Sequence, residues 1–213
     1  MPVSAVRASP ERVAAGQGEL GLLPVLPALR GLLPGLRRGQ VVSIEGGGSL
    51  ALAFAAGASA EGSWCAVVGM PDCGVLAAAG MGVDLARLLL IDEPGPRWAE
   101  VVATLVGSVE VVLLRPPVRP SSVEVRRLTA HARRHGGVLV VAGGWTGAPL
   151  RLRVVSSIWT GLGDGHGNLR GRRVRVVAEG KGRPETAWLW LPGPDGSVEA
   201  ADVAVDELVE AAG

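Results

Sequence analysis

VVSIEGGGSLALAFAAG, residues 41–57, joins a short apolar run to a glycine-rich turn and then to a helix of small residues. Strand, glycine turn and helix in this order form the unit on which many α/β proteins bind phosphate groups. The segment therefore predicts an α/β fold. It also raises the question of whether this loop still binds phosphate.

Further apolar runs alternate with helical segments on the C-terminal side of this unit. After the strand at 41–44 and the helix at 49–60, we expect strands at 64–68, 88–91, 109–114 and 138–142, and helices at 72–80, 96–106 and 121–135. Strands without polar alternation are typical of a parallel sheet whose two faces are both covered by helices.

The pattern changes to period two after Gly143. Apolar positions alternate with Arg151 and Arg153 in one run and with Arg173 and Arg175 in another, and Trp188 and Trp190 share a face in a third. Such alternation predicts antiparallel strands with one solvated face, with residues 161–171 as a hairpin loop. The expected fold class is α/β, with a mostly parallel sheet, helices on both faces and a C-terminal antiparallel hairpin extension.

Three segments are expected: a flexible N-terminal segment at 1–19, a core domain at 20–197 and an acidic amphipathic helix at 198–213. The prolines within residues 20–38 exclude a long helix there. We expect short turns and extended pieces, with an apolar assembly surface between Leu20 and Leu36. The tail helix would carry Val205 and Leu208 on an apolar stripe and its acidic residues on another.

Composition indicates a cytoplasmic protein. Hydrophobic residues make up 48% of the 213 residues, yet no long apolar stretch lacks a charge, glycine or proline, so we expect no membrane span. The N-terminal residues lack the apolar core of a secretory signal. Cys65 and Cys73 fit reduced thiols in such a compartment.

The small net charge of +1 conceals an uneven distribution. Residues 115–183 hold fourteen basic and three acidic side chains, whereas residues 184–213 hold seven acidic and no basic ones. A polyanionic partner, pairing between the middle segment and the tail, or a solvated surface with balanced charges would each explain this division.

Several local patterns resemble the RecA core in order along the chain. They are GMGVDLARLLLIDEPGPRWAEVVATLV, VEVVLLRPP, GGVLVVAGG and APLRLRVVSSIWTG with LRGRRVRVVAEGKG, and together they span about residues 20–192. Within this superfamily, LPVLPALRGLLPGLRRGQVVSIEG, SWCAVVGMPD and GLGDGHGNLRGRRVRVVAEG are most similar to the ImuA-prime family of actinobacterial mutasomes.

The resemblance implies a non-catalytic accessory protein of SOS-induced, error-prone translesion DNA synthesis. The implied partners are an ImuB-type relative of the Y-family polymerases and an error-prone C-family polymerase, with RecA itself as a further candidate. A DNA-binding RecA paralogue, an NTPase with an atypical loop and a SulA-type inhibitor of cell division remain alternatives.

The residues that a RecA-type nucleotide site needs are missing. The loop from Gly46 through Gly47 to Gly48 is three residues shorter than a P-loop, and Ser49 stands at the lysine position. The position of the metal-binding aspartate falls near Arg115, and that of the water-positioning glutamate near Met70, with Asp72 close by. We therefore expect no ATP hydrolysis and no cofactor, and we interpret the glycines as a packing turn with Ser49 as the helix N-cap.

The remaining candidates concern binding. Arg151, Arg153, Arg173 and Arg175 are candidates for contact with DNA phosphates, and Trp188, Trp190, Val205 and Leu208 for contact with a protein partner or for internal packing. His131 and His135 have the spacing of a metal pair on a helix. No third ligand stands near them in the sequence, so no metal site is predicted.

Overall fold

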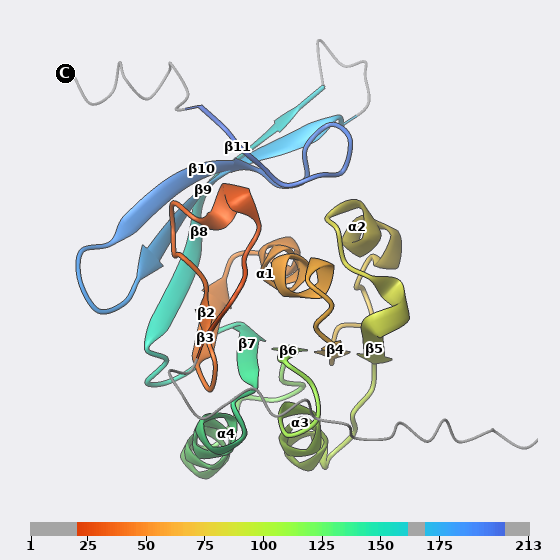
Figure 1. Ribbon diagram of the computed structural model, residues 1–213, viewed down its shortest axis with the longest axis vertical. Coiled ribbons are helices and arrows are strands. Elements are labelled where there is room, and N and C mark those ends of the chain that lie inside the picture. The colour runs from red at the N-terminus through yellow and green to blue at the C-terminus, as the bar shows by residue number, and fades with distance from the viewer. Residues whose placement is uncertain (1–20, 162–168, 203–213) are drawn as a thin grey trace, which may run out of the picture.

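Nine strands form one mixed sheet in the computed structural model, which describes residues 21–161 and 169–202 (Figure 1). The order across the sheet is β11 (Glu199–Ala200), β10 (Glu185–Trp190), β9 (Gly171–Glu179), β8 (Leu150–Thr160), β3 (Val41–Glu45), β7 (Val138–Ala142), β6 (Val111–Leu114), β4 (Cys65–Val68) and β5 (Leu88–Ile91). The strands from β8 to β5 are parallel, and β9, β10 and β11 continue the sheet antiparallel. The expected fold class, including the C-terminal antiparallel extension, is confirmed.

Helices cover both faces of the parallel part. In Figure 1, α1 (Gly48–Ala60) and α2 (Val75–Gly80) lie on one side of the sheet, and α3 (Trp98–Val106) and α4 (Ser122–His135) lie on the other. Ser121 begins α4 with a capping box, in which its hydroxyl accepts from the Glu124 amide and the Glu124 side chain accepts from the Ser121 amide. Gly136 ends the helix in the left-handed conformation. No helix in the described part of the chain combines the length and the apolar composition that crossing a membrane requires.

Helix α1 is the centre of the larger core. Its residues from Leu50 to Ser59 are all buried, because the parallel strands lie on one side of it and the curved extension of β9 and β10 on another (Figure 1). A helix that is apolar on every side must be enclosed in this way. A second core lies between the opposite face of the sheet and helices α3 and α4.

The proline-containing segment packs on α1. It forms β1 (Leu22–Leu23), the short 3-10 helix η1 (Pro27–Leu29) and β2 (Leu36–Arg37), as the expectation of short turns and extended pieces predicted. However, the expected apolar assembly surface is wrong for the residues described here. Leu23, Val25, Leu29, Leu32, Leu33 and Leu36 are buried in the chain's own core.

The C-terminal expectation needs a correction as well. Residues Glu199–Ala200 form β11 and pair with β10, so the predicted helix cannot begin at residue 198. The physical reason is that the open edge of β10 offers backbone partners, as when the Ala201 amide donates to the Trp188 carbonyl at 2.8 Å. The predicted N-terminal segment at 1–19, most of the hairpin loop, and Val205 and Leu208 lie outside the described residues.

Candidate functional site

The glycine loop after β3 turns directly into α1. Gly46 has a φ of +90°, Gly47 is the N-cap and Gly48 is the first helical residue. The expected cap at Ser49 is therefore wrong: the helix begins one residue earlier, and the N-cap glycine supplies no side-chain hydrogen bond. The interpretation of the glycines as a tight turn between strand and helix fits this geometry.

Side chains that lie on a neighbouring strand, or just beyond the end of one, stand directly against this loop. A Cβ added at Gly48 would stand 3.2 Å from Met70 Cε and 3.3 Å from Arg115 Nη2, and one added at Gly46 would stand 3.1 Å from the Val154 Cβ. Met70 is itself buried. A phosphate cradle needs backbone amides that face open space. Here the loop instead packs against two apolar side chains and a guanidinium group.

Arg115 is paired rather than exposed as a lone cation. Its Nη1 donates to Asp72 Oδ1 at 2.5 Å, and this hydrogen bond holds the pKa of Asp72 below its usual range. The Arg115 backbone is fixed by its amide, which donates to the Val68 carbonyl at 2.9 Å. Asp72, the acidic residue close to the expected glutamate position, thus pairs with the arginine that stands near the expected aspartate position.

The four predicted arginines do share one face of the sheet. In the register between β8 and β9, Arg153 stands opposite Val177 and Arg151 opposite Glu179, while Arg175 and Arg173 follow at alternate positions of β9. Residues that face each other across two strands point to the same side. Arg153 also binds Glu179 at 2.6 Å.

The structure brings the two tryptophans onto this same face. Trp188 stands opposite Arg175 and Trp190 opposite Arg173 in the pairing of β10 with β9. The Arg173 guanidinium lies 5.5 Å from the ring centre of Trp188 and 5.7 Å from that of Trp190, within cation–π range. It also donates to the Asp202 carbonyl. Trp188 is buried, at 6% exposure, and therefore serves internal packing, whereas Trp190 is half-buried. We call this group the Arg–Trp face, consisting of Arg151, Arg153, Arg173, Arg175, Trp188 and Trp190, with Trp190 as its accessible ring.

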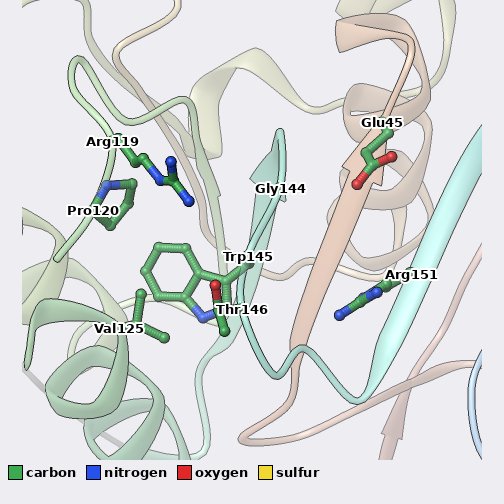
Figure 2. Close-up of a pocket in the computed structure, with 8 residues that line it drawn as sticks. All are labelled: Glu45, Arg119, Pro120, Val125, Gly144, Trp145, Thr146 and Arg151. Atoms are coloured by element: carbon green, nitrogen blue, oxygen red, sulfur yellow. The ribbon is translucent and has the colours of Figure 1, made fainter. Parts of the chain in front are cut away.

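A hollow that the sequence patterns did not indicate adjoins the Arg–Trp face (Figure 2). It has a volume of about 470 Å³ and is lined by Glu45, Arg119, Pro120, Val125, Gly144, Trp145, Thr146 and Arg151. Trp145 is held by its ring nitrogen, which donates to Thr129 Oγ1 at 3.4 Å, and by its amide, which donates to Ser43 Oγ at 3.3 Å. Only one feature of the sequence could have indicated this hollow. Glu45, Arg119 and Trp145 all lie at or after the carboxyl ends of parallel strands, which is where open α/β sheets usually bind ligands.

The two histidines lie together on α4. The ring centres of His131 and His135 are 4.2 Å apart, and burial lowers the pKa of His131. Within residues 21–161 and 169–202, no group of three side chains that could hold a metal ion occurs. His135 lies in the last helical turn, where a positive charge is favourable.

Comparisons with known proteins place the parallel half of the chain in a family. Residues 31–147 match the MT3502 N-terminal domain, a span that includes the glycine loop and ends just before β8. The chain is also 37% identical over 145 residues to an uncharacterized protein, Rv3395c, of Mycobacterium tuberculosis (strain ATCC 25618 / H37Rv), a match that covers 67% of this chain and 68% of the relative. The chain belongs to the MT3502 N-terminal domain family.

Proposed function

We propose that the protein is a non-catalytic, RecA-like accessory subunit of error-prone translesion DNA synthesis. It would act through contacts with an ImuB-type relative of the Y-family polymerases and with a C-family polymerase, in the cytoplasm and at the nucleoid when DNA is damaged. The resemblance of the sequence to the ImuA-prime family supplies this role.

The packing of side chains against the glycine loop supports the non-catalytic part of the proposal. Met70, Arg115 and Val154 pack against the loop that would have to surround a nucleotide's phosphates. Opening that space would require moving a buried methionine and breaking the ion pair between Arg115 and Asp72. An accessory role that needs no nucleotide is consistent with this packing.

The Arg–Trp face is the surface that we assign to partner contact. Tryptophan and arginine are enriched among the residues that contribute most to protein–protein binding. Arg173 is already held between two rings, so little side-chain entropy remains to be lost when a partner binds there.

Co-purification tests this proposal. The tagged full-length chain is co-expressed with the ImuB relative and the C-family polymerase encoded in the same genome, and recovery is compared with and without Mg-ATP. We expect recovery of the ImuB relative that is independent of nucleotide and reduced by Trp190→Ala. Trp64→Ala is the matched control, because Trp64 is an exposed tryptophan at the opposite part of the sheet. If neither the ImuB relative nor the C-family polymerase is recovered with the tagged wild-type chain, the proposal is refuted.

DNA binding is a second candidate, favoured by the four arginines on one face. Arg151 and Arg153 are both exposed, so they can be replaced with little effect on packing. If this face binds a DNA backbone, Arg151→Ala with Arg153→Ala should weaken binding and lower the slope of log affinity against log salt by about one per lost phosphate contact. The control is Arg126→Ala with Arg127→Ala on α4. Equal salt slopes for all three proteins, measured by fluorescence anisotropy, would exclude this face.

A further inference from the structure

Strand β5 ends the sheet with an apolar edge. It lies at one end of the strand order, and no described strand pairs with its outer side (Figure 1). Although its sequence is Leu-Leu-Leu-Ile, Leu89 and Leu90 are exposed, with Leu90 at 43%. Leu76 on the neighbouring helix α2 is 86% exposed. Proteins normally protect such edges with charges, prolines or covering segments, because an open apolar edge is a template for another strand.

The backbone of β5 has hydrogen-bonding groups that face away from the sheet. The Ile91 carbonyl accepts from the Gly69 amide at 2.9 Å, so the backbone groups of Ile91 face inward, towards β4. Backbone groups alternate in direction along a strand. The amide and carbonyl of Leu90 therefore point outward, where a further strand could pair with them.

The residues that flank β5 carry opposite charges. Arg87 precedes the strand, and Asp92 and Glu93 follow it. If a second β5 lay antiparallel to the first with the two Leu90 residues opposite each other, Leu89 would face Ile91 of the other copy. Arg87, which ends the 3-10 helix η2 (Leu85–Arg87) just before the strand, would then lie near the acidic residues that follow the other β5. Opposed residues in this register lie on the same side of the sheet, as antiparallel pairing requires. Arg87 donates through Nη1 to the Gly62 carbonyl at 2.6 Å and its Nε lies 3.7 Å from Asp84 Oδ2, so a contact with the other copy would use its remaining nitrogen, Nη2.

We propose that this edge binds a second copy of the chain, with β5 pairing antiparallel to β5 across a two-fold axis at Leu90. The free backbone groups, the exposed leucines and the opposite charges at the two ends of one strand all fit this occupant. A two-fold contact uses the same surface on both copies, so it closes at a dimer. The proposal is independent of the Arg–Trp face and of the role in DNA synthesis.

Sedimentation velocity of the full-length protein over a concentration series tests the dimer. We expect a monomer–dimer equilibrium in the wild type and at least a tenfold higher dissociation constant for Leu90→Lys, because two lysines would face each other across the axis. Leu90 is exposed, so its replacement should leave the melting temperature of the monomer unchanged. A monomer at every concentration, assemblies that grow beyond two copies, or a dimer insensitive to Leu90→Lys would overturn the proposal.

Cysteine cross-linking tests the register. In a hydrogen-bonded antiparallel pair the two Cα atoms lie about 5.5 Å apart, which a disulfide can span. In a Cys73→Ser background, Leu90→Cys should form a covalent dimer under mild oxidation, whereas Ile158→Cys should not. Ile158 is a strand residue of matched exposure, 45%, on β8, well inside the opposite half of the sheet. Equal cross-linking at the two positions would overturn the proposed register.

Discussion

Gly57 lies in the second half of α1, where the proline-containing segment, residues 21–40, crosses the helix. A Cβ added there would stand 2.5 Å from the Val25 Cα and carbonyl carbon and 2.6 Å from the Leu26 amide nitrogen. These are backbone atoms of a segment whose side chains are buried in the same core, so the segment cannot move aside cheaply. Gly57→Ala therefore probes whether residues 21–40 belong to the chain's own core.

Two opposing effects determine whether Gly57→Ala raises or lowers the free energy of unfolding. Alanine is better than glycine inside a helix by about 1 kcal/mol. Overpacking a well-filled core costs about 1–3 kcal/mol, and contacts as short as these belong at the upper end. We expect Gly57→Ala to lower the free energy of unfolding by roughly 2 kcal/mol, or the melting temperature by about 4–8 °C in a chain of this size.

Chemical and thermal unfolding followed by circular dichroism measure this effect. Gly31→Ala is the control, because a Cβ at Gly31 meets no atom of the described residues within 4 Å. That change should leave stability unchanged or raise it by up to about 1 kcal/mol. If Gly57→Ala is as stable as the wild type, then the proline-containing segment does not pack on α1 as described.

Four further predictions concern Gly69, the glycine loop and the thiols. Gly69→Ala should unfold the protein at a much lower temperature than the wild type in a thermal melt, because its Cβ would stand 2.2 Å from the Arg115 carbonyl oxygen at a φ of +71°. Mg-ATP should not shift the melting temperature of the wild type or of Ser49→Lys, since Arg115 still lies against the loop. A clear shift in either protein would contradict the conclusion that side chains occupy the space beside the glycine loop. Burial is the main cause that raises the pKa of Cys65 to about 12, so mass spectrometry after iodoacetamide treatment at pH 8 should find Cys73 modified before Cys65. The same raised pKa contributes stability below pH 9 that is lost as the pH rises towards 12, and a free energy of unfolding that stays constant across this range would contradict the assignment.

The parallel half of the fold was predictable because each strand there is a short apolar run with clear ends. The expected strands at 88–91 and 138–142 agree with β5 and β7 at both ends. Sequence patterns could not distinguish an apolar segment that packs on its own core from one that packs on a neighbour. For this reason the burial of Val25 and Leu29 was missed, and the exposure of Leu90 was not foreseen.

For the candidate site, the sequence predicted which residues of one strand share a face, but not which residues of neighbouring strands contact each other. The period of two placed Arg173 and Arg175 on one face, as the structure confirms. The contact of Arg173 with Trp188 and Trp190 depends on the register between β9 and β10, which no single strand reveals. The start of the tail was predicted wrongly because Glu199–Ala200 pair with the edge of β10, and this tertiary contact overrides the helical pattern.

Damage-induced mutagenesis in the strain that encodes the chain tests the central proposal most directly. Mutation frequency after ultraviolet irradiation is compared between the parent strain, a strain lacking the gene, and deletion strains that carry the wild-type gene or Ser49→Ala. We predict that deletion lowers the induced frequency and that both genes restore it, because the role needs no nucleotide at the loop. An induced frequency that deletion leaves unchanged would contradict the proposed function, and failure of Ser49→Ala alone would contradict its independence from nucleotide.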